Sequence, residues 1–274
     1  MASKTVLIVY AHQSLSSFNA AAKDAAVEVL TAQGCMVAVS DLYAMKFQAA
    51  ATAEDLIGGI QHPEHFCYAE EAKLAWEEGN LSIDIAEEQR KLNEADLVIF
   101  QFPMYWFSVP AIMKGWIDRV LTLGFAFTQE KRYSEGLFKD KKAMLSFTTG
   151  SQESMFSENG INGDMNVTLW PLQNGILHYC GFQVLAPQIF WAPSSVPRDE
   201  CSGMLERWRY RLWGLLGEEP LSFTPLECFE KEGFQLKPEV QEQHAGQEFG
   251  LTVGIHLGKR LPPNSQMKSI KAGV

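Results

Sequence analysis

The sequence predicts an α/β protein built on a parallel sheet, followed by a smaller and less regular C-terminal part. Short apolar runs rich in β-branched and aromatic residues alternate with longer segments of helical periodicity. These runs suit buried strands that are covered on both faces by helices. From Leu221 onward, several prolines and glycines replace this alternation. The regular α/β part is therefore expected to end near residue 220.

The composition is that of an ordinary globular protein, with 46% hydrophobic and 20% charged residues among 274. The formal net charge of -10 argues against nucleic acid and anionic membranes as partners. The five cysteines form no CxxC pair, which suits free thiols in a reducing compartment. No signal-peptide pattern precedes the first strand, so a cytoplasmic location is expected.

The stretch from Asp96 to Thr128 organises the chain. Leu97 to Phe102 predicts a buried strand, Pro103 to Val109 a loop, and Pro110 the start of an amphipathic helix. A membrane-spanning helix is the alternative for this apolar run, but such a helix needs about 20 apolar residues. The polar Gln101 and two prolines interrupt the run. A strand, loop and helix in this order form a ligand crevice at the carboxyl edge of a parallel sheet.

Three consecutive aromatic residues in this loop suit a flat aromatic ligand. They are Tyr105, Trp106 and Phe107. One of them could belong to the core, but three neighbouring side chains point in different directions and cannot all face one core.

The other elements follow in order from the same patterns. Gly34 is expected to stop the first helix, and Pro171 is expected in the first turn of a later one. The predicted elements are strand Thr5 to Tyr10, a helix to about Gln33, strand Met36 to Asp41, helical pieces to about Asn93, strand Lys142 to Thr148, helix Leu169 to Tyr179, strand Gln183 to Trp191, and helix Met204 to Leu216. Met267 to Val274 are expected to be disordered.

A polar loop, His12 to Asn19, joins the first strand to its helix. Its serine hydroxyls and the backbone N–H groups of the helix N-terminus could bind a phosphate. It is neither a GxGxxG motif nor a P-loop. Because any loop of this kind can be rich in serine, an ordinary connection is the alternative.

The segments QFPMYWFSVPAIMKGWIDRV and EFGLTVGIHLGKRLPP resemble the NAD(P)H:quinone oxidoreductases, or DT-diaphorases. This family has a flavodoxin-like three-layer fold, with five parallel strands in the order 2-1-3-4-5. The resemblance covers nearly the whole chain. It implies an FAD-binding catalytic domain over residues 1–220 and an extension over 221–274 that contributes to the NAD(P)H site. It also implies a homodimer with active sites at the interface.

The resemblance also implies the site residues. FAD would contact His12, Ser17, Phe18, Asn19, Ala20, Ala21, Cys67, Pro103, Met104, Tyr105, Trp106, Phe107, Thr148, Thr149, Gly150, Ser151 and Phe156. Substrate would contact Ala126, Phe127, Thr128, Trp106, Phe107 and Tyr179. The expected catalytic positions are Gly150, Phe156 and Asn162.

Several of these positions depart from the family pattern. Family members commonly have a proton-donating tyrosine and histidine where this chain has Phe156 and Asn162. Phenylalanine has no donor, and an amide is no general acid at neutral pH. We therefore expect loop amides, Asn162 and water to stabilise the developing charge. Cys67 replaces a glutamine, and Phe127 and Gln129 replace tyrosines.

No metal site is expected. His178 and Cys180 are two residues apart, so on a helix they face different sides. A shorter relative, the quinone reductase that prefers dihydronicotinamide riboside, binds a structural metal with two histidines and a cysteine. Of those ligands only His178 is present, because Asn174 and Phe223 occupy the other positions.

The implied activity is a ping-pong, two-electron reduction of quinones by NADH or NADPH through FAD. One alternative is a quinone reductase working mainly with dihydronicotinamide riboside, against which the C-terminal extension argues. A second is a one-electron flavodoxin-type carrier, although such carriers are shorter. A third is a weakly catalytic flavoprotein whose main role is to bind and stabilise other proteins.

Overall fold

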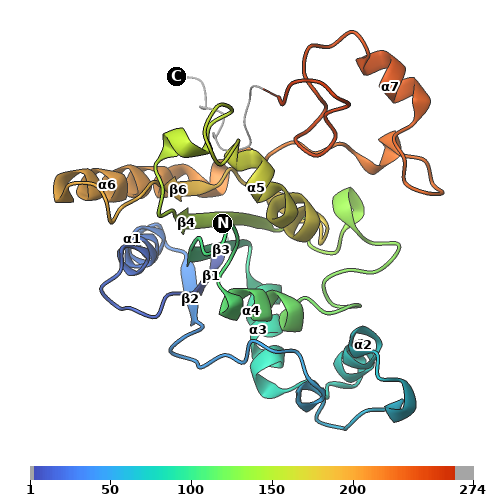
Figure 1. Ribbon diagram of the computed structural model, residues 1–274. Helices are drawn as coiled ribbons and strands as arrows, with labels where there is room; N and C mark the ends of the chain where they lie inside the picture. The colour runs from blue at the N-terminus through green and yellow to red at the C-terminus, as the bar shows by residue number, and fades with distance from the viewer. Residues whose placement is uncertain (1–2, 263–274) are drawn as a thin grey trace.

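The computed structural model describes residues 3–262, and its centre is a parallel sheet (Figure 1). The strand order is β2-β1-β3-β4, with β5 and β6 both paired to the free edge of β4. The predicted flavodoxin-like order is confirmed. The strands are β1 Thr5–Tyr10, β2 Met36–Asp41, β3 Leu97–Pro103, β4 Lys142–Thr148, β5 Gln183–Val184 and β6 Gln188–Phe190; the α-helices are α1 Phe18–Ala32, α2 Tyr68–Glu78, α3 Ile83–Glu94, α4 Ala111–Val120, α5 Met165–Leu172, α6 Arg198–Gly214 and α7 Pro238–His244.

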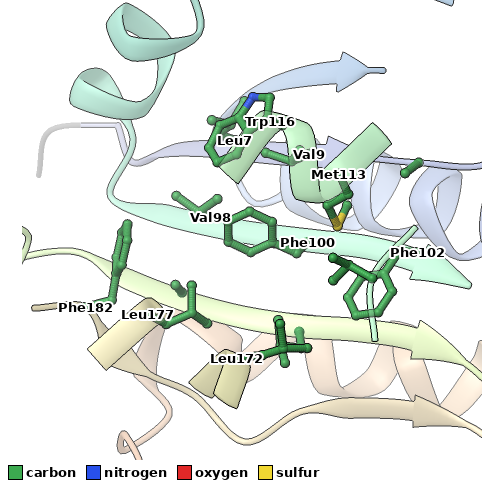
Figure 2. Close-up of a cluster of buried hydrophobic side chains, with 14 of the residues drawn as sticks. Leu7, Val9, Val98, Phe100, Phe102, Met113, Trp116, Leu172, Leu177 and Phe182 are labelled. Carbon is green, nitrogen blue, oxygen red and sulfur yellow. The ribbon is translucent and has the colours of Figure 1, made fainter. Parts of the chain in front are cut away.

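Helices cover both faces of the sheet, because successive strand residues point to opposite sides. On β1, Val6 and Ile8 pack with α1 and α6, whereas Leu7 and Val9 pack with α3, α4 and α5. Figure 2 shows the second of these clusters, in which Trp116 of α4 lies over β1 and β3. All of these side chains are buried. The central strands are therefore apolar on both faces, as their sequences predicted.

The predicted fifth strand, Gln183 to Trp191, is wrong as one continuous element. It forms two short strands, β5 and β6. Gln183 lies opposite Lys142 and Gln188 lies opposite Ser146, so the edge chain has one more residue than β4 between these pairs. Pro187 lies in this gap and has no N–H to donate to the ladder. The extra residue acts as a bulge at the edge of the sheet.

The predicted helix Leu169 to Tyr179 is wrong in its start and in its type. An α-helix begins at Met165, because the Asp164 carboxylate accepts the Asn166 N–H at 2.8 Å as a cap. Pro171 consequently lies inside the helix, where it removes one intrahelical hydrogen bond. The chain continues as a π-helix over Gln173–His178, the kind of widened turn found where the regular bonding is interrupted.

Helix α6 also begins earlier than predicted, at Arg198 rather than Met204. Pro197 precedes it, and Asp199 and Glu200 lie in its first turn, where negative charge favours a helix N-terminus. These residues are polar and mostly exposed. The apolar periodicity used for the prediction therefore begins only at Met204.

The part after Leu221 consists of short elements, among them α7, which lies away from the sheet (Figure 1). Phe223 stacks on His178, with ring centroids 4.1 Å apart, and its ring also lies 6.1 Å from that of Trp170. The predicted disorder of Met267 to Val274 lies outside the described residues. Over residues 3–262, no helix is long and apolar enough to cross a bilayer.

Candidate active site

Three loops leave the sheet at the same edge. Strands β1, β3 and β4 are parallel, and their register pairs Tyr10 with Gln101 and Pro103 with Thr148. The loops that follow Tyr10, Pro103 and Thr148 therefore start side by side. Three separate segments predicted to bind the cofactor meet here, as expected for the carboxyl edge of an open parallel sheet.

The first loop leads into the N-terminus of α1. The Ser17 hydroxyl caps this helix by accepting the Ala20 N–H at 3.0 Å. The first turn of α1 contains no acidic residue, unlike those of α2, α3 and α6. The remaining N–H groups of the turn, with the Ser14 and Ser16 hydroxyls, fit an anionic phosphate.

Some predicted residues of this loop can offer only their backbone to a ligand. The side chains of Asn19 and Ala20 are buried, and the Phe18 ring packs 5.0 Å from that of Phe190. His12 accepts the Ser14 N–H at 2.9 Å through Nδ1. Burial lowers the pKa of His12, so its imidazole is neutral near pH 7.

The second loop is a two-residue hairpin with a strained backbone. Tyr105 and Ser108 exchange two backbone hydrogen bonds of 3.0 Å. Between them, Trp106 and Phe107 have φ of 49° and 61°, in the left-handed region that such turns usually fill with asparagine and glycine. Trp106 is 96% exposed. The hairpin thus presents a large aromatic surface at an energetic cost, a combination often found at functional sites.

The third loop, Thr148 to Ser151, is fixed by hydrogen bonds of the Thr149 hydroxyl. The Thr149 hydroxyl donates to the Ser151 carbonyl at 2.7 Å and accepts the Ala192 N–H at 3.1 Å. Gly150 is exposed, and a Cβ added to it would meet no atom within 4 Å. The protein's own packing therefore leaves room beside Gly150 for a ligand to approach the backbone.

Two predicted catalytic positions differ in their surroundings. Phe156 is buried, with its ring 5.7 Å from the rings of both Phe107 and Trp191. It forms an apolar wall behind the aromatic hairpin. Asn162 is half-buried, and its side-chain amide makes no hydrogen bond within the part of the chain described. That amide is free to bind a ligand or water.

A buried chain of hydrogen bonds beneath this edge was not predicted. The Ser146 hydroxyl donates to Gln101 Oε1 at 2.7 Å, and Gln101 Nε2 donates to Asn19 Oδ1 at 2.8 Å. Asn19 Nδ2 then donates to Thr148 Oγ1 at 2.9 Å. The four residues are buried and join β4, β3 and α1. The available signal was a glutamine and a serine within otherwise apolar strands.

Two of the predicted substrate residues, Phe127 and Tyr179, belong to a second aromatic group. The rings of Phe127 and Tyr179 lie 5.3 Å apart, and Tyr179 lies 5.2 Å from Tyr133. Within residues 3–262 no ring pair joins this group to Phe107 and Phe156. Ala126 is fully buried, so only Phe127, Thr128 and Tyr179 of the group are accessible.

Two further positions lie apart from the three loops. Cys67 is exposed just before α2, which packs on a small separate core cluster. His178 stacks on Phe223, and burial lowers the pKa of this histidine to about 4, so its imidazole is neutral at pH 7. Among the residues described, no three histidine, cysteine, aspartate or glutamate side chains are grouped to hold a metal ion.

Comparison with known proteins identifies the family. Residues 4–212 match the model of a flavodoxin-like fold family. The chain is 50% identical to rat NAD(P)H dehydrogenase (quinone) 1, over 99% of this chain and 100% of that protein. The chain belongs to the family of flavodoxin-like quinone reductases. The predicted resemblance is confirmed.

Two other members of the family share most of the chain. Rat ribosyldihydronicotinamide dehydrogenase (quinone) is 54% identical over 84% of this chain and 100% of its own length. The crystal structure of a protein assigned as a quinone reductase from Klebsiella pneumoniae superposes with a TM-score of 0.82. It is 40% identical and covers 86% of this chain and 95% of that one. The chain therefore shares its core both with a relative named for NAD(P)H and with a relative named for ribosyldihydronicotinamide.

We predict that Gln101→Met weakens both folding and flavin binding. The variant leaves Asn19 Oδ1 and the Ser146 hydroxyl without their buried partner, which should lower the free energy of unfolding by about 2 kcal/mol. Because Asn19 then keeps only its bond to Thr148 and holds the start of α1 less firmly, flavin should bind the flavin-free protein more weakly in a fluorescence titration. Gln89→Met is the matched control, since buried Gln89 bonds Val120 and Thr122 away from these loops. Equal flavin affinity in both variants would contradict the positioning role.

We predict that Trp106→Asn stabilises the flavin-free protein. Asparagine tolerates the left-handed backbone, and the exposed indole contributes little packing, so thermal unfolding should show a gain of about 1 kcal/mol. Trp106→Ala is the control, because it removes the ring without relieving the backbone. Both variants should bind FAD more weakly than the wild type. If Trp106→Asn and Trp106→Ala both unfold at a lower temperature than the wild type, the turn is not strained.

Proposed function

We propose that the protein catalyses the two-electron reduction of quinones by NADH or NADPH, with FAD as its cofactor. The observation that supports this most is the meeting of three loops at one sheet edge. They offer a helix N-terminus without acidic residues, an exposed aromatic hairpin and an open glycine loop. The same chain is 50% identical to a protein named NAD(P)H dehydrogenase (quinone) 1. Bound FAD would supply the chemistry, accepting a hydride at N5 from the nicotinamide and giving it to a quinone after the oxidised donor has left.

Each loop has a distinct part in the proposed reaction. The N-terminus of α1 and the serines of the first loop bind the FAD pyrophosphate. Trp106 and Phe107 would hold the flavin ring and position the reacting molecule. The backbone N–H groups of Gly150 and Ser151 would stabilise negative charge that develops on the flavin. Phe156 cannot donate a proton, so Asn162 and water supply the polar contacts that the ring requires.

We also propose a homodimer in which each site borrows residues from its partner. Trp106 is 96% exposed, and Phe107 is 48% exposed. Aromatic surface of this kind, with polar residues around it, is typical of protein interfaces. Phe127 and Thr128 of one subunit would cover the flavin held by the other. A cytoplasmic location belongs to the same proposal.

The C-terminal extension, residues 221–274, supports ordinary NAD(P)H as the donor in this proposal. Together with α5 and the π-helix, its described part encloses a cavity of about 360 Å³. That volume lies within the range of small-molecule sites. The lining residues are Arg132, Tyr133, Trp170, Asn174, His178, Thr224, Leu226, Phe229, Phe234, Gly254 and Ile255.

A second candidate is a reductase that uses dihydronicotinamide riboside. Rat ribosyldihydronicotinamide dehydrogenase (quinone) is 54% identical, but 84% of this chain already spans its whole length. The riboside lacks the adenosine half of NAD(P)H and would leave the cavity beside the extension unused. The values of kcat/KM for NADH, NADPH and the riboside separate the two candidates.

We predict that anaerobic stopped-flow mixing with NADPH bleaches the flavin absorbance of the purified holoenzyme and that a quinone restores it. Slow bleaching with NADPH and fast bleaching with the riboside would favour the second candidate. Bleaching with neither donor, despite bound FAD, would favour a role in binding other proteins. The Trp106→Ala variant is the control, because it should bleach slowly with every donor.

We predict that combining Phe156→Tyr with Asn162→His raises the rate of flavin reduction by less than about tenfold, since a limiting general acid would be worth about a hundredfold or more. The physical reason is that backbone amides and Asn162 already stabilise the charge. Asn162→Ala should lower the rate and serves as the complementary variant. A hundredfold acceleration of the double variant in stopped-flow would show instead that the missing tyrosine and histidine limit the enzyme.

A further inference from the structure

Five of the eleven residues that line the cavity beside the C-terminal extension have aromatic rings, counting the imidazole of His178. Trp170 of α5 and His178 of the π-helix line it together with Phe229 and Phe234 of the extension. Gly254 lies so close to the Trp170 indole that a Cβ there would be 2.3 Å from it. Aromatic side chains in the lining of a cavity suit the stacking of a planar heteroaromatic ring. At neutral pH they offer no positive charge from His178, whose pKa burial lowers to about 4.

Arg132 adds a positive charge to this apolar cavity. Its guanidinium lies 4.4 Å from the centre of the Phe234 ring, a contact that leaves N–H donors free. No hydrogen bond or ion pair connects the guanidinium to another residue in the range 3–262. A backbone hydrogen bond and, as a smaller contribution, the charge of Arg132 lower the pKa of Glu130. The Glu130 carboxylate bonds the Thr128 hydroxyl at 3.0 Å and not the guanidinium. A half-buried guanidinium with free donors is suited to a phosphate.

Ring contacts connect the cavity to the predicted substrate residues. Tyr133 lines the cavity and lies 5.5 Å from His178 and 5.2 Å from Tyr179. Tyr179 in turn lies 5.3 Å from Phe127. A dinucleotide whose nicotinamide lies beside Phe127 and Tyr179 would therefore have a continuous aromatic surface leading to the cavity.

The proposed function already assigns this cavity to the adenosine half of the donor. We propose that Arg132 binds the 2′-phosphate of NADPH there, which makes Arg132 a selectivity residue for NADPH over NADH. The inference rests on the proposed function for the position of the nicotinamide. An arginine beside the adenosine ribose is also how other dinucleotide-binding folds accept the 2′-phosphate. NADH has only a hydroxyl at that position and gains nothing from the guanidinium.

The kinetic test compares Arg132→Gln with Lys131→Gln in the holoenzyme. Lys131 is adjacent and exposed and does not line the cavity, so its variant removes the same charge without touching the site. Arg132→Gln should lower kcat/KM for NADPH by about tenfold, the size expected for losing a charge-assisted hydrogen bond. The kcat/KM of Arg132→Gln for NADH should change by less than about twofold. The kcat/KM values of Lys131→Gln for NADPH and for NADH should also change by less than about twofold. Equal losses for NADPH and NADH, or none, would overturn the proposal.

A binding test separates this inference from the proposed function. Calorimetry with 2′,5′-ADP should show binding to the wild-type holoenzyme, about tenfold weaker binding to Arg132→Gln, and partial recovery in Arg132→Lys. The 5′-ADP control lacks the 2′-phosphate and should bind wild type and Arg132→Gln alike. If 2′,5′-ADP binds in this pattern but neither donor reduces the flavin, the phosphate site stands and the proposed function fails. If 2′,5′-ADP and 5′-ADP bind the wild type equally, Arg132 does not recognise the phosphate.

Discussion

The hydrogen bonds of Gln101 hold the candidate site together. Its amide group bonds Ser146 of β4 on one side and Asn19 of α1 on the other, and Asn19 also bonds Thr148. All four side chains are buried, so each donor and acceptor needs its partner to offset the loss of water. The start of α1 and the end of β4 cannot shift independently while this chain is intact. The loop that follows β1 and the loop that follows β4 therefore keep a fixed relative position.

The fold could be predicted well where local pattern and packing agree. The runs that became β1 and β3 are apolar on both faces, and their ends were predicted within one residue. Prediction failed where a polar feature decided the boundary. Helix α5 starts at Met165 because Asp164 caps it, and α6 starts in a polar segment that has no apolar periodicity. The gap between β5 and β6 depends on pairing with β4, which no local pattern contains.

The candidate site was likewise predictable where the local sequence pattern is informative and unpredictable where distant residues decide the geometry. The three loops were predicted because aromatic and small polar residues follow buried strands. Gln101 was visible only as an interruption in an apolar run, and its partners on other elements could not be known without the sheet register. The left-handed backbone of Trp106 and Phe107 was equally hidden, because neither residue type favours that conformation. Both residues adopt a backbone conformation that their residue type disfavours, and both side chains are exposed. A local conflict of this kind is expected at a functional site.

The overall charge makes local donors decisive for anionic ligands. A net charge of -10 repels a dinucleotide or a flavin pyrophosphate at long range. Binding must therefore depend on short-range groups that are not already neutralised by carboxylates. The structure offers two such places: the first turn of α1, which has no acidic residue, and the guanidinium of Arg132, which has no ion pair within the described chain. One lies at the carboxyl edge of the sheet and the other in the cavity beside the extension. Two separate anion sites match a reaction in which both the cofactor and the electron donor carry phosphates.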